Sequence, residues 1–489
     1  MMKHWPKMIL CCLALSALDC QTTSRAGQLA EEARLGSLAR VLVKEIALLE
    51  QEKAGLLTTL REAKVEPPEL SADDSRRPSR NIVREVARLE ARSKQLKREI
   101  YLLKQAAAAT RTAEIVSRLS RQVAELRGLA LRKPVEFAYL EKDRLRVVLD
   151  EALDKQIPPE KFPDYEFALK YLGLIPKELD LKQLIVSLYA EQVGGLYDDE
   201  TGKLYVMKQF ELDSEVSQII LAHEICHALQ DQHYRLLDWP IHLTDNDDRA
   251  TAAAAVVEGD ATILMAEWSI KHCSWRVMLD MPQALFLSQQ GMDTAPPALI
   301  EMLIFPYVSG MNFMQPLSLA GRDDRYEKVF RELPQSTEQI LHPAKYFGRA
   351  DLPTEIALPD FSAKLGPEWS LRTTNVMGEL GVRLALAQSP AGRTPSKIPA
   401  IQAAAGWDGD RYWVYRTTDR AQWLFAWASV WDTARDAEEF ATAYGALAPP
   451  GARLERAGQL VLVYESSQPA AAKLFHKLAR PVLEAIEIK

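Results

Sequence analysis

The sequence predicts a mainly helical α+β protein with an N-terminal coiled-coil helical hairpin, a mixed central domain and a small C-terminal α+β unit. Three observations predict this fold class. Apolar residues recur at heptad spacing before residue 131. A β-hairpin pattern near residue 195 is followed by two long helical patterns, and strand and helix patterns alternate after residue 400. The 489 residues allow two to four domains at roughly 100–200 residues per domain.

The composition is that of a folded globular protein. Apolar residues make up 47% of the chain and charged residues 26%, so the sequence does not read as disordered. The net charge is -7, and nucleic acid is therefore not expected as a partner, because phosphate binding requires a basic surface. Five cysteines in a chain of this length exclude a disulfide scaffold.

The first 20 residues have the pattern of a secretory signal. Lys3 and Lys7 precede an apolar run over residues 8–18, which is shorter than the roughly 20 residues that span a bilayer. Cys20 follows, and the segment resembles a bacterial lipoprotein signal, which implies lipidation of Cys20; the charged Asp19 departs from that pattern. We expect an exported protein of the periplasm or cell envelope that meets the membrane only through a lipid anchor. The alternative is a cytosolic chain with an apolar start.

Residues 21–132 are predicted to form a helical arm of coiled-coil type. Two heptad series, separated by a segment with Pro67, Pro68 and Pro78, predict an antiparallel hairpin, and an intermolecular coiled coil is the rival arrangement. Such an arm is typical of a spacer, or of a docking element that binds a protein partner or self-associates. The series are Leu42, Ile46, Leu49, Lys53, Leu56 and Leu60, and Ile82, Val86, Leu89, Ser93, Leu96, Ile100, Leu103 and Ala107.

The central domain is predicted over residues 133–387. Residues 195–206 read as a β-hairpin whose turn contains Gly202. Asp213 or Ser214 can cap a helix that runs to about Leu236, and a second helix is predicted over residues 252–271. The Met-, Leu- and Phe-rich stretch 277–320 is expected to be helical core.

A linker is predicted at residues 388–400, within a C-terminal α+β domain over residues 388–489. Strands are predicted at 411–417, 423–431 and 460–465, and helices at 434–447 and 469–486. Five tryptophans in this region are expected in the core, and the alternative is an aromatic platform for a ligand. They are Trp407, Trp413, Trp423, Trp427 and Trp431.

The pattern His223-Glu224-Ile225-Cys226-His227 within the first predicted central helix indicates a metal site. Histidines at i and i+4 lie on one face of a helix, where their imidazoles can bind one zinc ion. Glu224 is then placed to act as general base on a water bound to the metal. Both histidines continue the apolar line of Val216 and Ile220 and are therefore expected to face inward. The alternative is a pair of hydrogen-bonded core histidines.

A catalytic zinc usually has three protein ligands and one open position. Glu258, 31 residues after His227, is the candidate third ligand. Val256, Val257 and Ala261 surround it, and a carboxylate in apolar surroundings needs a metal or a partner.

These residues resemble the gluzincin branch of zinc metallopeptidases, and more narrowly a poorly characterised bacterial and archaeal zincin-like group that shares the tract 336–343. The resemblance covers roughly residues 135–440. It implies a zincin core, one Zn²⁺ per chain, a peptide or protein substrate, and these roles: His223, His227 and Glu258 as ligands, Glu224 as base, and Asp231 as the residue that orients His227.

One position departs from the gluzincin pattern. Thr262 stands where many gluzincins have an aspartate four residues after the glutamate ligand. Asp260 lies about 200° around the helix from Glu258 and is not expected to replace it. The support of His223 is therefore in question.

Three further features accompany the motif. Tyr307 and His342 are candidates for stabilising an oxyanion, with capping of a buried polar group as the alternative for each. Cys226 and Cys273 could form a disulfide or remain two thiols. If the 195–206 hairpin has an exposed edge, a substrate could bind there as an added strand.

The sequence thus predicts an exported zinc metallopeptidase in which Glu224 is the general base. The alternative is a structural or interaction protein of the envelope that uses its coiled coil, with a structural or inactive zinc site. A zinc hydrolase of non-peptide amides also agrees with the motif.

Overall fold

The computed structural model describes residues 25–62, 77–192, 195–208, 211–274, 277, 295–388 and 398–487. Cys20, the predicted signal and the predicted break at residues 67 and 68 lie outside these ranges. Within them, no helix combines the length and the apolar character that crossing a membrane requires. The predicted fold class is confirmed, because the structure is a mainly helical α+β protein.

The chain divides into two compact units, a smaller one that ends at Arg118 and a larger one that begins at Leu119. The division falls inside α2, so the last turns of this helix belong to the larger unit.

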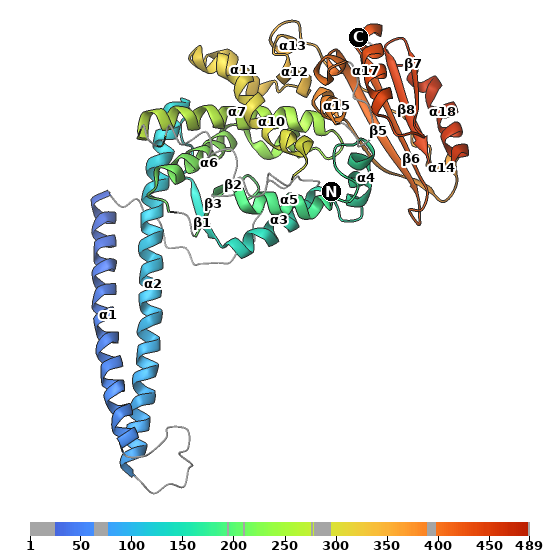
Figure 1. The fold of residues 1–489 in the computed structure, drawn as a ribbon. Helices are drawn as coiled ribbons and strands as arrows, with labels where there is room; N and C mark the ends of the chain where they lie inside the picture. The colour runs from blue at the N-terminus through green and yellow to red at the C-terminus, as the bar shows by residue number, and fades with distance from the viewer. Residues whose placement is uncertain are drawn as a thin grey trace. The chain divides into compact units, whose positions relative to one another are not determined.

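The smaller unit is the predicted antiparallel hairpin of α1 (Arg25–Glu62) and α2 (Arg77–Arg127), which lie side by side in Figure 1. Arg92 pairs with Glu45 at 2.9 Å and Lys53 with Glu90 at 2.9 Å, which fixes the antiparallel direction. Ser93 lies in the buried seam and donates a hydrogen bond to Glu50. The seam also contains Leu89, Leu96 and Ile100.

The larger unit begins with a three-stranded sheet and short helices. β2 and β3 form the predicted hairpin, β1 pairs in parallel with β3, and the strand order is β1-β3-β2. Gly202 has φ 67° in the turn, where a side chain would be strained. The elements are β1 (Glu136–Leu140), α3 (Lys142–Gln156), α4 (Phe162–Tyr171), α5 (Leu181–Gln192), β2 (Gly195–Asp198) and β3 (Lys203–Met207).

Three long helices follow. Ser214 caps α6 (Glu215–Tyr234) as predicted, by accepting a hydrogen bond from the Ser217 N–H, and α6 ends two residues before Leu236 because Arg235 adopts φ 54°. α7 (Asp247–His272) begins five residues before the predicted start, because Asn246 caps it. The third is α10 (Pro297–Leu319), and the short η2 (Leu236–Asp238) and η3 (Pro240–His242) join α6 to α7.

Helices α7 and α10 cross at a contact that only glycine permits. A Cβ on Gly310 would lie 2.0 Å from the Ala255 carbonyl oxygen, and a Cβ on Gly259 would lie 2.3 Å from the Gly310 carbonyl carbon. The two backbones therefore touch beside Glu258, and the crossing sets the distance between that residue and the side chains of α10.

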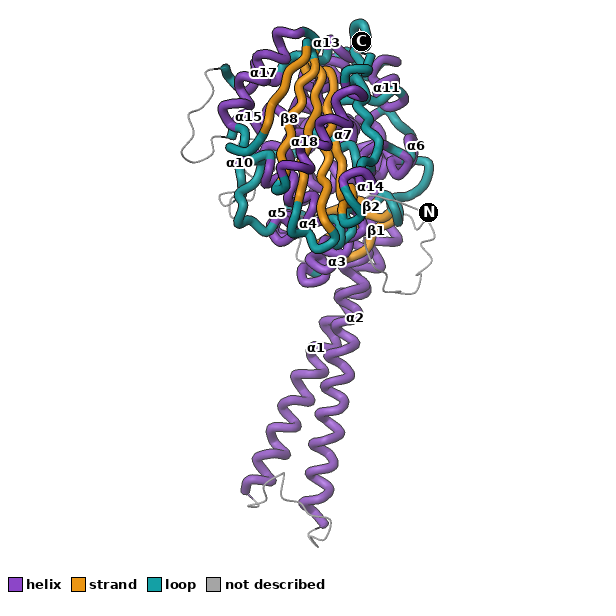
Figure 2. The backbone as a smooth tube through the Cα atoms, turned by 90° about the vertical axis from the view of Figure 1, so that its right-hand side faces the viewer, coloured by secondary structure: helices purple, strands orange, loops and turns teal. Residues whose placement is uncertain are grey.

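The C-terminal sheet has the strand order β4-β5-β6-β8-β7 and is antiparallel throughout. α18 lies across one face of it (Figure 2). Its elements are β4 (Trp369–Asn375), β5 (Trp407–Thr417), β6 (Trp423–Trp431), α17 (Ala434–Leu447), β7 (Arg453–Ala457), β8 (Leu460–Ser466) and α18 (Pro469–Leu483). β4 and β7 were not predicted, and β4 places the start of the sheet 19 residues before residue 388.

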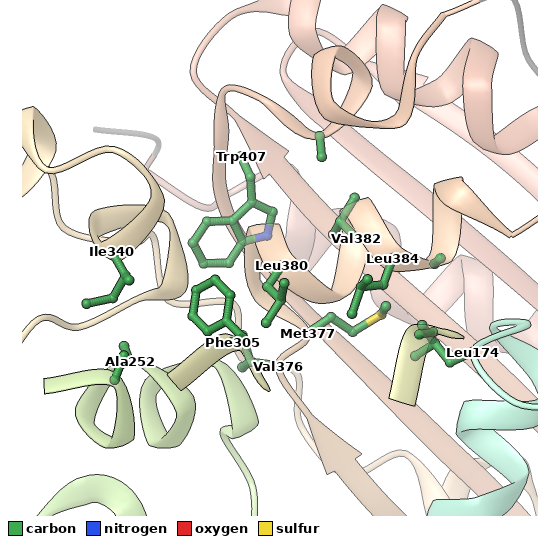
Figure 3. Close-up of a cluster of buried hydrophobic side chains, with 14 of the residues drawn as sticks. Leu174, Ala252, Phe305, Ile340, Val376, Met377, Leu380, Val382, Leu384 and Trp407 are labelled. Carbon is green, nitrogen blue, oxygen red and sulfur yellow. The ribbon is translucent and has the colours of Figure 1, made fainter. Parts of the chain in front are cut away.

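The central helices and the C-terminal sheet share one apolar core. Figure 3 shows Phe305 of α10 against Trp407 of β5, with Leu380 and Ile340 beside them. Trp413, Trp427 and Trp431 are buried as well, and Trp423 is partly buried against the same core, so these tryptophans serve packing. The short helices of this region are α11 (Asp324–Arg331), α12 (Thr337–Leu341), α13 (Ala344–Phe347), α14 (Ser362–Leu365), α15 (Gly378–Ala387) and α16 (Ala400–Ala404).

We predict that Gly310→Ala lowers the free energy of unfolding by about 1–3 kcal/mol or more, because α7 and α10 must separate to admit the methyl group. Gly445→Ala is the matched control, since Gly445 lies on α17 and its Cβ would meet open space. This control should be neutral or stabilising by about 0.5–1 kcal/mol. Chemical denaturation of both variants measures the difference, and equal stabilities would show that the crossing tolerates a side chain.

Candidate metal centre

His223, His227 and Glu258 converge on one point between α6 and α7. Nε2 of His223 lies 3.0 Å from Nε2 of His227 and 3.1 Å from Oε2 of Glu258, and Nε2 of His227 lies 3.3 Å from the same oxygen. Their side chains are 9–13% exposed. The structure thus brings together the three residues that the sequence proposed as ligands.

The three donor atoms fit a tetrahedral zinc ion. With zinc–ligand bonds of about 2.0–2.1 Å, two ligand atoms lie roughly 3.3–3.4 Å apart, close to the distances observed. Two imidazole nitrogens and one carboxylate are ordinary zinc ligands, and a set of three leaves a fourth position. Burial acts to raise the pKa of Glu258, but the imidazoles of His227 and His223 outweigh it, so this pKa lies well below its usual range.

Helix geometry explains how the two elements present these groups. His223 and His227 are one turn apart on α6, and their rings meet edge to face at 4.6 Å between centroids. Glu258 comes from the middle of α7, which packs against α6, and its neighbour Gly259 admits α10 on another face of α7. The site is therefore built on regular helices.

Gln230, not Asp231, is the partner of His227. Oε1 of Gln230 lies 2.9 Å from Nδ1 of His227, while Nε2 of Gln230 donates to the Val257 carbonyl oxygen at 3.0 Å and to Oδ2 of Asp260 at 2.8 Å. The two acceptors hold the amide nitrogen of Gln230, so its oxygen faces the imidazole. His227 must then donate from Nδ1, which leaves the Nε2 lone pair directed at the other ligands.

The implied role of Asp231 requires a correction. Oδ2 of Asp231 accepts a hydrogen bond from the Tyr197 hydroxyl at 2.8 Å, and Oδ1 accepts one from the Leu236 N–H at 3.1 Å. Asp231 therefore ties the end of α6 to the β2–β3 hairpin. The reason is local: its side chain faces β2 and the turn that follows α6, whereas Gln230 faces α7.

Asp260 lies beneath the site, on the side of α7 away from Glu258. It is fully buried and accepts hydrogen bonds from Gln230, from Nε of Arg127 at 2.9 Å and from the Tyr326 hydroxyl. Burial acts to raise the pKa of Asp260, and the Arg127 guanidinium outweighs it and holds this pKa below its usual range. Asp260 does not replace the aspartate that the gluzincin pattern places at position 262, as expected, but it supports His227 through Gln230.

His223 has a different environment. Its Nδ1 and the Thr262 hydroxyl oxygen are both buried without a hydrogen-bond partner among the described residues. Thr262 therefore leaves the outer nitrogen of this histidine without the carboxylate of the gluzincin pattern. Tyr307 of α10 lies against the His223 ring, with 6.0 Å between centroids and 26° between planes. Gly310 lies one turn after Tyr307 on α10, and its close contact with α7 brings Tyr307 against the His223 ring.

Glu224 is held by the edge strand β2. Its Oε2 accepts a hydrogen bond from the Tyr197 N–H at 2.7 Å. Among the described strands, β2 is an edge strand that pairs only with β3. The Tyr197 N–H that bonds Glu224 lies on the unpaired edge of β2. The predicted base and the predicted edge strand are thus in direct contact.

His342 belongs to another part of the molecule. Nε2 of His342 pairs with Oε1 of Glu379 at 2.9 Å, and the hydrogen bond with Glu379 raises the pKa of His342. Its tract is anchored by Thr337, which donates to Asp248 in the first turn of α7. Asp248 precedes Glu258 by ten residues, or about 15 Å along the helix. The structure therefore does not bring His342 together with the three candidate ligands, because tertiary packing anchors its tract at the first turn of α7.

A second acidic group is already occupied by a lysine ammonium group. Glu338, Asp351 and Asp432 lie close enough to share a cation. Nζ of Lys345 bonds all three carboxylates at 2.6, 2.8 and 2.7 Å. The ammonium group fills the role that a metal ion would have here.

The two cysteines in the described ranges remain thiols. Cys226 is buried with Sγ 3.9 Å from Oδ2 of Asp260, and Cys273 follows α7 about 20 Å further along the helix axis. A disulfide requires Cα atoms within roughly 7 Å, so the alternative of two thiols is confirmed.

We predict that Gln230→Leu weakens zinc binding about 10–100-fold, because His227 loses the acceptor that selects its tautomer. Gln218→Leu is the control, since Gln218 lies on the same helix and bonds the Leu212 carbonyl. Competition with a chromophoric chelator measures both affinities. Equal zinc affinity in the two variants would remove Gln230 from the metal centre.

Comparisons with known proteins add one finding. The model of a domain of unknown function, DUF8575, matches residues 369–482, which begin at the first residue of β4 and end within α18. No curated protein and no solved structure matches the chain.

Proposed function

We propose that this protein is a zinc-dependent peptide hydrolase of gluzincin type. The observation that carries the proposal is the convergence of two imidazoles and one carboxylate, at tetrahedral spacing, beside a glutamate held by an edge strand. A pair of ordinary core histidines would not require a buried carboxylate against both nitrogens.

The roles of the residues follow from their positions. His223, His227 and Glu258 would hold the metal, and Gln230 keeps the Nε2 lone pair of His227 directed towards it. Zinc supplies a Lewis acid that polarises a carbonyl and lowers the pKa of a bound water. Glu224 would accept the proton of the attacking water at its carboxylate, and a peptide that pairs with the outer edge of β2 would lie beside this base.

Tyr307 is the remaining candidate for stabilising the oxyanion. Its ring lies over His223, on the α10 side of the centre. A phenol there could donate a hydrogen bond to the developing charge on the substrate oxygen. Export to the envelope and a lipid anchor at Cys20 remain part of the proposal from the sequence.

A structural or interaction role in the envelope is the second candidate. The hairpin favours it, because several large apolar side chains of α1 and α2 are exposed, as expected of a surface that meets a partner. They are Leu38, Val41, Val43, Leu48, Tyr101 and Leu102. In this reading the metal centre would stabilise the fold and Glu224 would be dispensable.

We predict that Glu224→Gln retains about one zinc per chain and lowers peptide hydrolysis by roughly 10²–10⁴-fold, because the amide cannot accept the proton. Glu258→Ala should lose the zinc. Glu332→Ala, which removes an exposed carboxylate just after the last residue of α11, should keep both the zinc and the peptide hydrolysis. Elemental analysis and a fluorogenic peptide library measure the two properties. Full hydrolysis by Glu224→Gln would overturn the mechanism.

We predict that Tyr307→Phe keeps its zinc and lowers kcat by about 10–10³-fold with little change in KM, because the donor acts on the oxyanion. Steady-state kinetics with the best peptide of the library test this. An unchanged kcat would assign Tyr307 a structural role instead.

A further inference from the structure

Arg127 is a buried arginine at the end of the arm's second helix. It is the last residue of α2 and lies within the larger compact unit, with a side chain only 1% exposed. Its Nε donates to Oδ2 of Asp260 at 2.9 Å, and its Nη1 donates to Oε1 of Glu327 at 3.0 Å. The guanidinium carbon lies 4.7 Å from the centre of the Tyr326 ring.

The same oxygen of Asp260 receives Arg127 and Gln230. Oδ2 accepts from Arg127 Nε and from Gln230 Nε2, while Oδ1 accepts from the Tyr326 hydroxyl. A fully buried carboxylate that loses its cation is strongly disfavoured, and its surroundings rearrange or admit water. Removal of Arg127 would therefore disturb the acceptor that holds the Gln230 amide.

The Gln230 amide in turn determines which nitrogen of His227 carries the proton. Its oxygen faces Nδ1 only while its nitrogen is engaged by Asp260 and the Val257 carbonyl. If that engagement weakens, the amide can reverse and offer its nitrogen to the imidazole. His227 would then lose the preference that directs the Nε2 lone pair at the metal position.

We propose that Arg127 is a positioning residue of the metal centre, which acts on the ligand His227 through Asp260 and Gln230. The inference rests on the proposed metal site and extends it to a residue outside the central helices. It also sets the N-terminal limit of the metal-binding unit within α2. A fragment that begins at residue 133 lacks this arginine, so the metal centre is not confined to the predicted domain over residues 133–387.

The test compares variants of the full chain. Arg127→Met removes the charge and the hydrogen bonds, and Arg127→Lys keeps the charge in a similar volume. Arg322→Met is the matched control, because Arg322 is also largely buried and its guanidinium lies 5.5 Å from the same Tyr326 ring, but it pairs with Glu267. Thermal unfolding in the absence of metal reports the stability of each variant.

Zinc affinity by chelator competition is the first readout. Arg127→Met should bind zinc about 10–100-fold more weakly than the unaltered chain, Arg127→Lys should recover part of this loss, and Arg322→Met should match the unaltered chain. A folded Arg127→Met chain with unaltered affinity would overturn the inference. If Arg127→Met fails to fold, the double variant Arg127→Met/Asp260→Asn removes both buried charges, and it should still bind zinc more weakly.

The tautomer of His227 in the metal-free chain is the second readout, and it requires neither zinc nor activity. Nitrogen NMR of labelled histidine should show the Nδ1–H form in the unaltered chain and in Arg322→Met, and a mixture in Arg127→Met. The same single tautomer in all three would overturn the inference. A chain that shows these changes but hydrolyses no peptide would end the proposed function and support the role of Arg127.

Discussion

The larger unit depends on the burial of one carboxylate, Asp260, where four helices meet. This residue of α7 bonds Arg127 of α2, Gln230 of α6 and Tyr326 of α11. A buried charge is tolerated only when its lone pairs are met, so these helices must keep their relative positions for the carboxylate to remain satisfied. Glu258 projects from the opposite side of the same helix. One segment of α7 thus carries the candidate ligand Glu258 on one side. On its other side it carries Asp260, which supports the ligand His227 through Gln230.

The contact between α7 and α10 imposes a second constraint. Two glycines, Gly259 and Gly310, allow the backbones to touch, and the close approach brings Tyr307 against His223. Towards its first turn, α7 is held by a separate polar cluster. Asp248 accepts hydrogen bonds from Thr337, whose hydroxyl also receives the Leu380 N–H, and a Cβ on Gly378 would lie 1.8 Å from Oδ1 of Asp248. Through this cluster and the shared apolar core, the C-terminal sheet buttresses the helix that presents Glu258.

Patterns in the sequence predicted the elements well where they depend on local chemistry. Heptad spacing predicted the hairpin, the Ser214 cap predicted the start of α6, and apolar runs rich in aromatic and β-branched residues predicted β6 and β8. The i, i+4 histidines indicated two ligands for the same reason, because helix periodicity determines which side chains share a face. Glu258 was indicated by its apolar neighbours, because a carboxylate in such surroundings needs a metal or a partner. β4 and β7 were missed because they are edge strands with mixed polarity, whose pairing depends on partners far along the chain.

The amino-acid sequence by itself determined which residues could bind a metal, because residue type and helical spacing are local properties. Only the tertiary structure decided which residues support them. Gln230 and Asp231 are neighbours on α6. Gln230 faces α7 and contacts His227, whereas Asp231 faces β2 and accepts a hydrogen bond from Tyr197. Arg127 lies 133 residues from Asp260, and His342 is carried away from the centre by its anchor on α7. Such contacts join segments that are distant in sequence, and no periodicity within one segment encodes them.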